Sequence, residues 1–350
     1  MLSYKQMVNM EKILTIVVPV YKVEQYINKC LDSCILYKAD GSVDEELMSL
    51  MEVLIINDGT PDNSAELSRE YTVRFPQTFI QIDKENGGHG SVWNLGVKLA
   101  KGKYIKFLDS DDWLENLDKM IRKLQQTNSD LITTSCICHC PGNVLWKLHI
   151  LDMEFDKVYD TDKFDWIGNR SHGNYVFHHC AIYKAALFRQ YLPLFLEKQP
   201  YDDMILCAAP IVGAKTFEAW DLEVYHYLMD REGQSISLEV RLKNINAQIK
   251  TRQYTIEWLL KHFEDIPGDS LKLPFFKKRL SNMLSYGYKS LLTEIPYQQS
   301  KCLSKDWENW LKKVQPQYSN LWLKLYRMMP FACYWLLYRT AVKVYCMIKK

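Results

Sequence analysis

Short apolar segments alternate with segments of helical periodicity through the first 126 residues, and this alternation limits the fold more than any other feature. Strands of about five residues separated by helices of about ten or more residues indicate βαβ units and a mainly parallel sheet with both faces covered. We therefore predict an α/β fold. The predicted strands are residues 13–20, 52–57, 79–82 and 104–108, and the predicted helices are residues 24–37, 64–75, 91–100 and 114–126.

The rest of the 350-residue chain has a different character. Residues 140–235 are less periodic and rich in His and aromatic side chains, which is typical of long substrate-binding loops. From residue 236 onward the pattern is mainly helical, with breaks at Pro267 and Pro296. We therefore predict an α/β domain over residues 1–235 and a helical C-terminal region over residues 236–350.

The charge of the chain is unevenly distributed, although its formal net charge is only +2. Residues 301–350 contain ten Lys and Arg against two acidic residues, a net charge of +8 that leaves −6 for the first 300 residues. Within this region the tail 321–350 interleaves aromatic side chains with Lys and Arg. Two interpretations stay open: an amphipathic helix that binds an anionic membrane surface, which the charge favours, and a helix packed on the domain. No run of eighteen apolar residues predicts a membrane-spanning helix.

The ten cysteines do not suggest a disulfide framework. The chain is long, shows no secretory leader and places several cysteines in apolar runs, so we expect reduced thiols and a cytoplasmic location. The run Cys136-Ile137-Cys138-His139-Cys140 invites a zinc interpretation. Because the second ligand pair of a structural zinc site is missing, a packed strand with small side chains is the better interpretation.

The strand predicted at residues 104–108 runs directly into three carboxylates, Asp109, Asp111 and Asp112. Clustered carboxylates at the end of a buried strand repel one another and lose hydration, and a hard divalent cation is the usual compensation. Asp109 and Asp111 are two residues apart, so in an extended segment their side chains point the same way. That spacing suits joint metal coordination, or one metal ligand and one ribose contact. Asp112 precedes Glu115 at capping-box spacing, and we expect it to cap the next helix.

Polar and glycine residues follow the second and third predicted strands as well. Asp58 begins a turn; it either caps that turn or contacts a base or ribose. Residues 86–90 (Asn-Gly-Gly-His-Gly) open a helix, whose N–H groups and dipole favour an anion. They match neither a P-loop nor the common dinucleotide fingerprint. Since ligands of parallel sheets bind beyond the carboxyl ends of the strands, we expect these residues to face one site.

Five motifs in order resemble the nucleotide-sugar-binding half of family 2 glycosyltransferases, which have the GT-A fold. The resemblance is dense over residues 12–115 and thins out over the acceptor half, residues 116–235. It implies an inverting transfer of a sugar from a nucleotide diphosphate donor, by default a UDP-sugar, to a hydroxyl of a glycan or lipid-linked acceptor. The motifs are Pro19-Val20-Tyr21, residues 57–64, Asn86-Gly87-Gly88 with Asn94-Leu95-Gly96, residues 100–105 and residues 108–112.

The resemblance further implies a role in cell-surface polysaccharide or glycolipid synthesis, at the inner face of the plasma membrane, with no nucleic-acid partner. It assigns Asp109 and Asp111 to a D-x-D element that binds Mn²⁺ or Mg²⁺ with the ribose and diphosphate of the donor. A cation there would stabilise the charge that the leaving diphosphate gains in the transition state. Asp58 would contact the nucleobase. The other donor-binding residues would be Pro19, Tyr21, Glu24, Asn86, Gly87, Gly88, His89, Asn94 and Ser110.

An inverting transfer also needs a base that accepts the proton of the acceptor hydroxyl. The downstream acidic pair of the family matches Asp202-Asp203. We expect Asp203 to be the base, with Asp202 as the second choice or as a helix N-cap. By the same resemblance Arg231 would pair with the diphosphate. His226 would approach the metal, although a packed histidine is the alternative.

One residue departs from the family pattern. Many relatives have Arg immediately before Asn94, whereas this chain has Trp93, and His89 is our candidate for the missing cation.

Two other classes of protein remain as alternatives. A sugar nucleotidyltransferase shares the strand–acid–helix architecture, but the segment 21–24 after the first strand lacks the glycines of its triphosphate loop. A non-catalytic sugar- or lipid-binding scaffold would be expected to lose the base, and the Asp202-Asp203 pair argues against it. The donor sugar, the acceptor and the linkage are not specified by these motifs.

Overall fold

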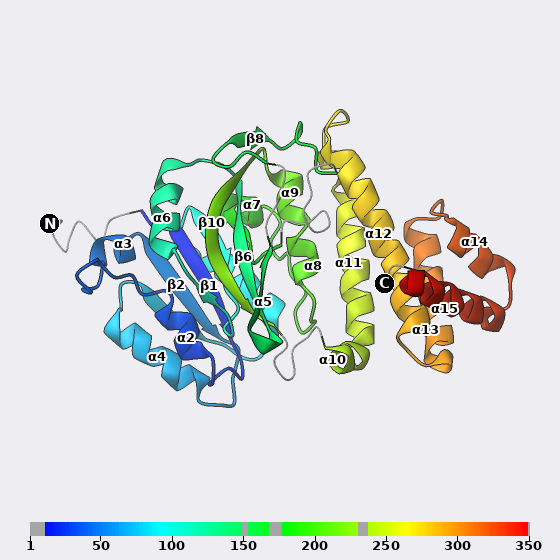
Figure 1. The fold of residues 1–350 in the computed structure, drawn as a ribbon, viewed down its shortest axis with the longest axis horizontal. Helices are drawn as coiled ribbons and strands as arrows, with labels where there is room; N and C mark the ends of the chain where they lie inside the picture. Colours follow the sequence, from blue (N-terminus) through cyan, green and yellow to red (C-terminus); the bar gives the residue numbers. More distant parts are fainter. Residues whose placement is uncertain (1–10, 149–152, 168–176, 230–236, 349–350) are drawn as a thin grey trace.

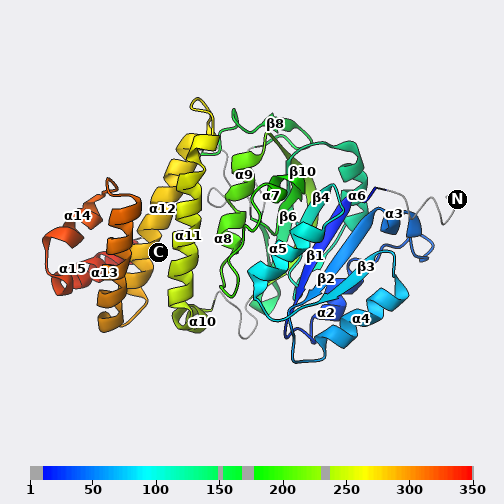
Figure 2. The same ribbon diagram turned by 180° about the vertical axis from the view of Figure 1, so that it is seen from behind.

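The computed structural model of this chain describes residues 11–148, 153–167, 177–229 and 237–348. Its centre is a mixed sheet of ten strands within these residues, and helices cover both faces of the sheet (Figures 1 and 2). The strand order is β3-β2-β1-β4-β9-β6-β10-β5, with β7 added beside β6 and β8 beside β10. The fold is the α/β, mainly parallel fold that the sequence predicts.

The N-terminal strands form the parallel half of the sheet. They are β1 (Leu14–Val20), β2 (Met51–Asn57), β3 (Phe79–Asp83) and β4 (Tyr104–Phe107). β1 lies between β2 and β4, and β3 pairs with the outer side of β2. Every residue of β1 and β2 is buried, because helices cover both faces, and this explains why these strands read as continuous apolar runs.

The second half of the sheet is mixed. β9 (Ala181–Lys184) is antiparallel to both β4 and β6 (Leu131–Cys140), and it joins the two halves. β10 (Thr216–Leu228) is parallel to β6 and antiparallel to the short β5 (Trp113–Leu114). The remaining strands are β7 (Val144–Leu148) and β8 (Val158–Asp160). The cysteine-rich run lies in β6 with Cys136 and Cys138 buried, so it is a packed strand.

Two hydrophobic cores lie on the two faces of the sheet. One core packs α2 (Ile27–Asp32), α3 (Glu45–Ser49), α4 (Ser64–Arg74) and α6 (Leu117–Gln126) on the sheet. The other packs α5 (His89–Leu99), α7 (Ala186–Arg189), α8 (Asp203–Leu206) and α9 (Ala209–Gly213). Alternate residues of β1 serve the two cores: Ile16 and Val18 belong to the first, and Val17 belongs to the second.

The C-terminal region is helical, as predicted. Its helices are α10 (Leu238–Lys243), α11 (Ile245–Lys261), α12 (Lys272–Thr293), α13 (Tyr297–Val314), α14 (Leu321–Met328) and α15 (Phe331–Ile348). α11 and α12 stand between the sheet domain and α13–α15 (Figure 1). The second core extends through them, since Phe276, Trp307 and Tyr334 are all part of it. The predicted boundary near residue 235 falls outside the described residues. Among the described helices, none has the length and apolar content needed to cross a bilayer.

Two helix predictions are wrong in their extent. The helix predicted at residues 24–37 spans only Ile27–Asp32, and the separate helix α3 follows it before β2. The helix predicted from residue 114 begins at Leu117, because Trp113 and Leu114 pair with β10 instead. Cross-strand pairing overrides the local helical pattern at this point.

Candidate active site

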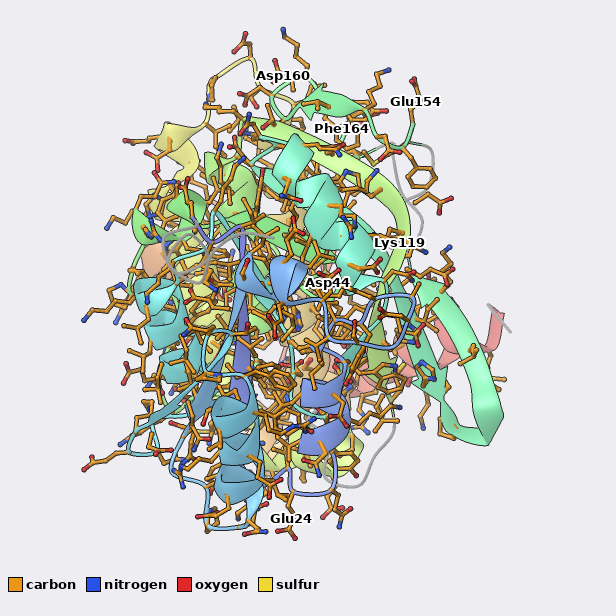
Figure 3. The ribbon with its side chains drawn as sticks, turned by 90° about the vertical axis from the view of Figure 1, so that its left-hand side faces the viewer. Glu24, Asp44, Lys119, Glu154, Asp160 and Phe164 are labelled. Atoms are coloured by element: carbon orange, nitrogen blue, oxygen red, sulfur yellow. The ribbon has the colours of Figure 1, made fainter. Side chains whose placement is uncertain are left out.

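The candidate site lies at the carboxyl ends of the parallel strands. Figure 3 shows Glu24, which follows β1, at the lower end of the molecule, and Asp160 of β8 at the opposite end. β2 and β4 flank β1 on opposite sides, so the chain changes direction across the sheet at β1. Such a switch point is where α/β sheets bind ligands.

The acidic segment after β4 forms a turn that is tied to β10. The N–H of Asp112 donates to the carbonyl of Asp109 over 3.0 Å, and the N–H of Asp109 donates to the hydroxyl of Tyr225 over 3.1 Å. Tyr225 in turn donates to Asp112 Oδ2 over 2.7 Å, and the N–H of Leu228 donates to Asp112 Oδ1 over 2.8 Å. The turn therefore has a fixed shape before any ligand binds.

This turn corrects two predictions. Asp112 is not a helix N-cap: its buried carboxylate anchors β10, and Asn116 occupies the N-cap position of α6. The extended geometry that we expected to align Asp109 with Asp111 is wrong as well, because the segment turns between Asp109 and Asp112. Ser110 is buried within the turn. The metal-binding role of Asp111 stays a prediction.

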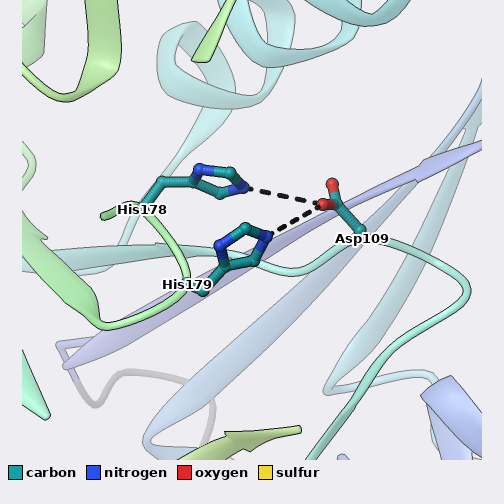
Figure 4. A group of neighbouring side chains, drawn as sticks. All are labelled: Asp109, His178 and His179. Atoms are coloured by element: carbon teal, nitrogen blue, oxygen red, sulfur yellow. Dashed lines mark ion pairs between the residues drawn. The ribbon is translucent and has the colours of Figure 1, made fainter. Parts of the chain in front are cut away.

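Two adjacent histidines face Asp109 from the segment that precedes β9. His178 Nε2 lies 3.6 Å and His179 Nε2 lies 3.8 Å from Asp109 Oδ2, as Figure 4 shows. Within the described residues, these three side chains form the group of His, Cys and acidic residues whose ligand atoms all lie within 4.8 Å of one another. Neither histidine was predicted from the sequence, since nothing in their spacing relates them to Asp109. The available signal was a His-His pair directly before an apolar strand.

The buried side chain of Lys106 fixes the segment that carries these histidines. Its ammonium donates to the carbonyls of His178 (3.3 Å), His179 and Ala181 (3.0 Å). Burial lowers the pKa of Lys106 to about 8. A fully buried lysine is tolerated here because three carbonyl oxygens replace its hydration.

His89, at the first position of α5, connects Asp109 with the downstream acidic pair. Its Nε2 lies 3.3 Å from Asp109 Oδ1, and its Nδ1 lies 3.1 Å from Asp202 Oδ1. Desolvation acts to lower the pKa of His89, but Asp202 and Asp109 outweigh it and raise that pKa well above its usual value. His89 is therefore an imidazolium, and it lies between the carboxylates of Asp109 and Asp202. The ring of His89 also packs on Trp93, with ring centroids 4.1 Å apart.

The two members of the acidic pair have different surroundings. Asp202 is buried, occupies the N-cap position of α8 without making a capping hydrogen bond, and pairs with His89. Asp203 is the first residue of α8. Burial raises the pKa of Asp203 and the Asp202 charge adds to this, against the opposing effect of His178. A raised pKa makes the Asp203 carboxylate a better proton acceptor than an aspartate with the ordinary pKa.

Asp58 holds the glycine-rich loop in place. Its Oδ1 accepts from Lys84 Nζ (2.5 Å) and the N–H of Gly87 (2.8 Å), and its Oδ2 accepts from the N–H of Gly88 (2.8 Å). Asn86 donates to the carbonyl of Asp58. Three donors satisfy the Asp58 carboxylate, so the contact that the structure shows is to the loop. Its contact with a nucleobase stays a prediction.

Other predicted donor-binding residues also hold loops. The side chain of Asn94 donates to the carbonyl of Phe195 (2.8 Å) and accepts from the N–H groups of Leu194 and Phe195. Glu24 accepts from the N–H of Asn63 over 3.2 Å. Pro19 is buried at the end of β1, whereas Tyr21 beyond it is exposed.

The structure does not gather His226 into the Asp109 group. His226 lies on β10 opposite Trp113, with its Nδ1 2.9 Å from His139 Nε2 and its Nε2 3.4 Å from Glu115 Oε2. These contacts match the alternative interpretation, in which His226 is a packed histidine and not a metal ligand. Arg231 lies outside the described residues.

The comparisons with known proteins agree with this fold. A mostly parallel sheet flanked by helices, with a helical C-terminal region, is the fold of the GT-A glycosyltransferases that this chain resembles in structure. The chain belongs to glycosyl transferase family 2, whose family model matches residues 15–192, about half of the chain.

Curated relatives match over shorter segments. The chain is 31% identical over 151 residues to "Glycosyltransferase GlyA" of Streptococcus pneumoniae serotype 4, which is 42% of this chain and 20% of that protein. It is 33% identical over 122 residues, 34% of this chain, to "Uncharacterized glycosyltransferase EpsJ" of Bacillus subtilis, of which this covers 33%. The "Minor teichoic acid biosynthesis protein GgaB" of B. subtilis is 35% identical over 98 residues, 28% of this chain and 10% of that protein. These matches thus span a third or less of the length of each relative.

Among solved structures, residues 1–349 of S. aureus TarS in complex with UDP-GlcNAc share the fold. The TM-score is 0.50 with 19% sequence identity, and the match covers 88% of this chain and 93% of that one. At this identity the likeness is one of fold.

Proposed function

We propose that this protein transfers a sugar, with inversion, from a UDP-sugar to a hydroxyl of a glycan or lipid-linked acceptor in a metal-dependent reaction. The observation that carries the proposal is the link from Asp109 through His89 to Asp202. It joins the D-x-D segment to the acidic pair, 113 residues after His89 in the chain, in one contiguous site. UDP is the first donor nucleotide to test, because TarS, which has this fold, binds UDP-GlcNAc.

In this proposal Asp203, Asp202 and Asp109 have different chemical roles. Asp203 accepts the proton of the acceptor hydroxyl, and burial favours that role because it raises the pKa of Asp203. Asp202 acts through His89, which it orients and keeps charged. A bound divalent cation would supply positive charge beside the leaving diphosphate. Asp109 and its neighbours on the acidic turn would hold it, with Mn²⁺ and Mg²⁺ as the candidates that the D-x-D resemblance names.

Release of UDP from a panel of UDP-sugars with Mn²⁺ tests this proposal. We expect Asp203→Asn to reduce turnover by about a hundredfold or more, within the range of a lost general base, while UDP still binds. Asp202→Asn should lose less turnover than Asp203→Asn, because it keeps Asp203 as the base. Asp160→Asn is the matched control, since Asp160 is exposed at the opposite end of the molecule. A chain that releases no UDP with any donor and acceptor, or an Asp203→Asn variant with full turnover, would contradict the proposal.

We also propose that the C-terminal helices hold the enzyme at the cytoplasmic face of the plasma membrane, where cell-surface polysaccharide or glycolipid is assembled. The inner side of α14 and α15 packs on the other C-terminal helices: Tyr334 is buried, and Arg327 Nε pairs with Glu308 Oε1 of α13 over 2.7 Å. The outer side is apolar and exposed. On α15 the exposed apolar side chains recur at helical spacing: Leu336, Leu337, Val344 and Met347.

The charge around this outer side fits an anionic lipid surface. Lys324 on α14 and Lys343 on α15 are exposed, and the whole 301–350 region carries a net charge of +8. Co-sedimentation with vesicles of phosphatidylglycerol, compared with phosphatidylcholine, measures the interaction. The double variant Leu336→Glu/Val344→Glu should lose binding to the anionic vesicles. Val73→Glu, at an exposed apolar position on α4, should keep this binding; equal binding by the wild type and both variants would refute the proposal.

A further inference from the structure

We propose that Asp109, His178 and His179 form a two-histidine, one-carboxylate site for a first-row transition-metal dication. The inference rests on the proposed function, since it names the protein ligands of the cation that the transfer would use. The two Nε2 atoms lie 3.6 and 3.8 Å from Asp109 Oδ2, and all three ligand atoms lie within 4.8 Å of one another (Figure 4). Ligand atoms at bonds of about 2.0–2.2 Å around one cation are about 3–3.5 Å apart, so small movements suffice to close the site.

The site is built before a metal arrives. Lys106 holds the carbonyls of both histidines, and the backbone N–H of Asp109 is held by Tyr225. His179 is stacked on Tyr227, with ring centroids 4.5 Å apart, and its ring centroid lies 3.8 Å from that of His178, so both neighbours restrict the movement of the His179 ring. Rings and carboxylate that are fixed in this way lose little conformational entropy on binding an ion.

The chemistry of the two rings fits metal binding. His178 Nε2 is buried and has no hydrogen-bond partner, and a buried ring nitrogen without one normally has a reason. His179 Nε2 lies 3.8 Å from the same Asp109 oxygen, and a ring nitrogen in this position can ligate a metal in its neutral form.

The ligand set favours one class of cation over another. Imidazole nitrogens suit transition-metal dications such as Fe²⁺, Ni²⁺ and Zn²⁺, whereas Mg²⁺ and Ca²⁺ prefer oxygen ligands; Mn²⁺ also favours oxygen ligands but belongs to the transition-metal series. Two imidazoles with one carboxylate leave several coordination positions for phosphate oxygens or for Asp111. Of the two ions that the sequence leaves open, the site therefore favours Mn²⁺ over Mg²⁺.

Direct metal binding tests this inference without reference to turnover. Co²⁺ is titrated into the metal-free protein and followed by its visible absorption, and Mn²⁺ binding is followed by electron paramagnetic resonance, both without nucleotide. We expect His178→Gln and His179→Gln each to weaken binding by about tenfold or more. Millimolar Mg²⁺ should not displace Co²⁺ from the wild type.

The matched control is His262→Gln. His262 also pairs with a carboxylate, with its Nδ1 2.6 Å from Asp265 Oδ2, but it lies at the end of α11. This variant should bind Co²⁺ as the wild type does. Thermal unfolding of each metal-free variant shows whether it is folded, and Asp109→Asn, a change of nearly the same shape, carries the same expectation where a histidine variant does not fold.

Undiminished Co²⁺ binding in both His178→Gln and His179→Gln would contradict the proposed metal site. A loss confined to Asp111→Asn and His226→Gln would instead support the ligands that the sequence predicts. The two proposals also fail separately: Co²⁺ binding that depends on His178 and His179 without UDP release would remove the proposed function alone. UDP release with metal binding unchanged in these variants would remove the site alone.

Discussion

Replacing Gly90 with alanine should slow catalysis by displacing the segment that carries Asp202. Gly90 lies in the first turn of α5, beside His89, and a Cβ there would lie 2.2 Å from the carbonyl oxygen of Leu196 and 3.1 Å from Asp202 Oδ2. Real Cβ contacts are essentially never shorter than 3.0 Å, so the helix and the Leu196 backbone must separate by about 0.8 Å, the difference between these two distances. Backbone is on the other side of this contact, and no side-chain rotation can relieve it.

The size of the effect follows from this displacement. Overpacking of this kind costs about 1–3 kcal/mol, and the better helix propensity of alanine returns about 1 kcal/mol, so we expect a net loss of stability of up to about 2 kcal/mol. A misplacement near 1 Å in an active site can lower the rate about a hundredfold. Because the shift falls between His89 and Asp202, we expect turnover of Gly90→Ala to fall by about ten- to a hundredfold.

Gly96→Ala is the control that separates a local displacement at the active site from a general loss of stability. Gly96 is on the same helix, and its added Cβ would lie 2.4 Å from Val17 Cγ1, within the core and away from the Leu196 segment. Urea unfolding should show a similar loss of stability for both variants. UDP release, measured well below either unfolding transition, should fall in Gly90→Ala alone. Wild-type turnover in Gly90→Ala, or an equal loss in both variants, would refute the reasoning.

Three further changes test other parts of the structure. Lys106→Met removes the donor to three buried carbonyls and should both lower the melting temperature and weaken Co²⁺ binding; loss of neither would contradict its role. The pKa of Asp130 is lowered, because hydrogen bonds from donors that include Lys184 outweigh the desolvation of this carboxyl. Asp130 therefore stabilises the fold at pH values above its unfolded pKa of about 3.9. Asp130→Asn should therefore cost about 1.5–3 kcal/mol in urea unfolding at pH 7, and the difference should shrink as the pH falls below 4; a constant difference would count against it. Gly287→Ala would place a Cβ 2.4 Å from Trp307 Cζ2, so it should lower stability by about 1–3 kcal/mol without changing UDP binding, as calorimetry can show.

The sequence alone predicts the parallel half of the fold because the information there is local. Each of the strands β1 to β4 is a short apolar run, and helical periodicity between them indicates crossover helices. The position of Asp109 follows as well, since a residue just after a parallel strand lies at the ligand-binding edge. The family resemblance adds the roles of Asp202 and Asp203, which no local pattern reveals.

The parts that the sequence does not predict depend on contacts between distant segments. His178 and His179 reach Asp109 only because β9 inserts between β4 and β6, and antiparallel pairing across such a distance leaves no local signature. The error at Asp112 has the same origin. A capping pattern competes there with Tyr225, 113 residues away, whose hydroxyl binds the carboxylate in a buried site. A tertiary hydrogen bond in a low-dielectric surrounding is stronger than an exposed cap.

His89 shows how the chain accommodates its departure from the family pattern. Trp93 stands where many relatives have an arginine, and its buried indole packs against His89, Phe107 and Phe195. An arginine at that position would bring its own charge, whereas the indole brings none, so the two nearby carboxylates need another cation. His89 provides it from one turn earlier on the same face of α5, within 3.3 Å of both carboxylates. Desolvation acts to raise the pKa of Asp109, but hydrogen bonds from His178 and His89 outweigh it and hold that pKa well below its usual value. The ring of His89 thereby couples the two halves of the site: a change at Asp202 alters the charge next to Asp109, and a cation bound at Asp109 alters the ring that orients Asp202.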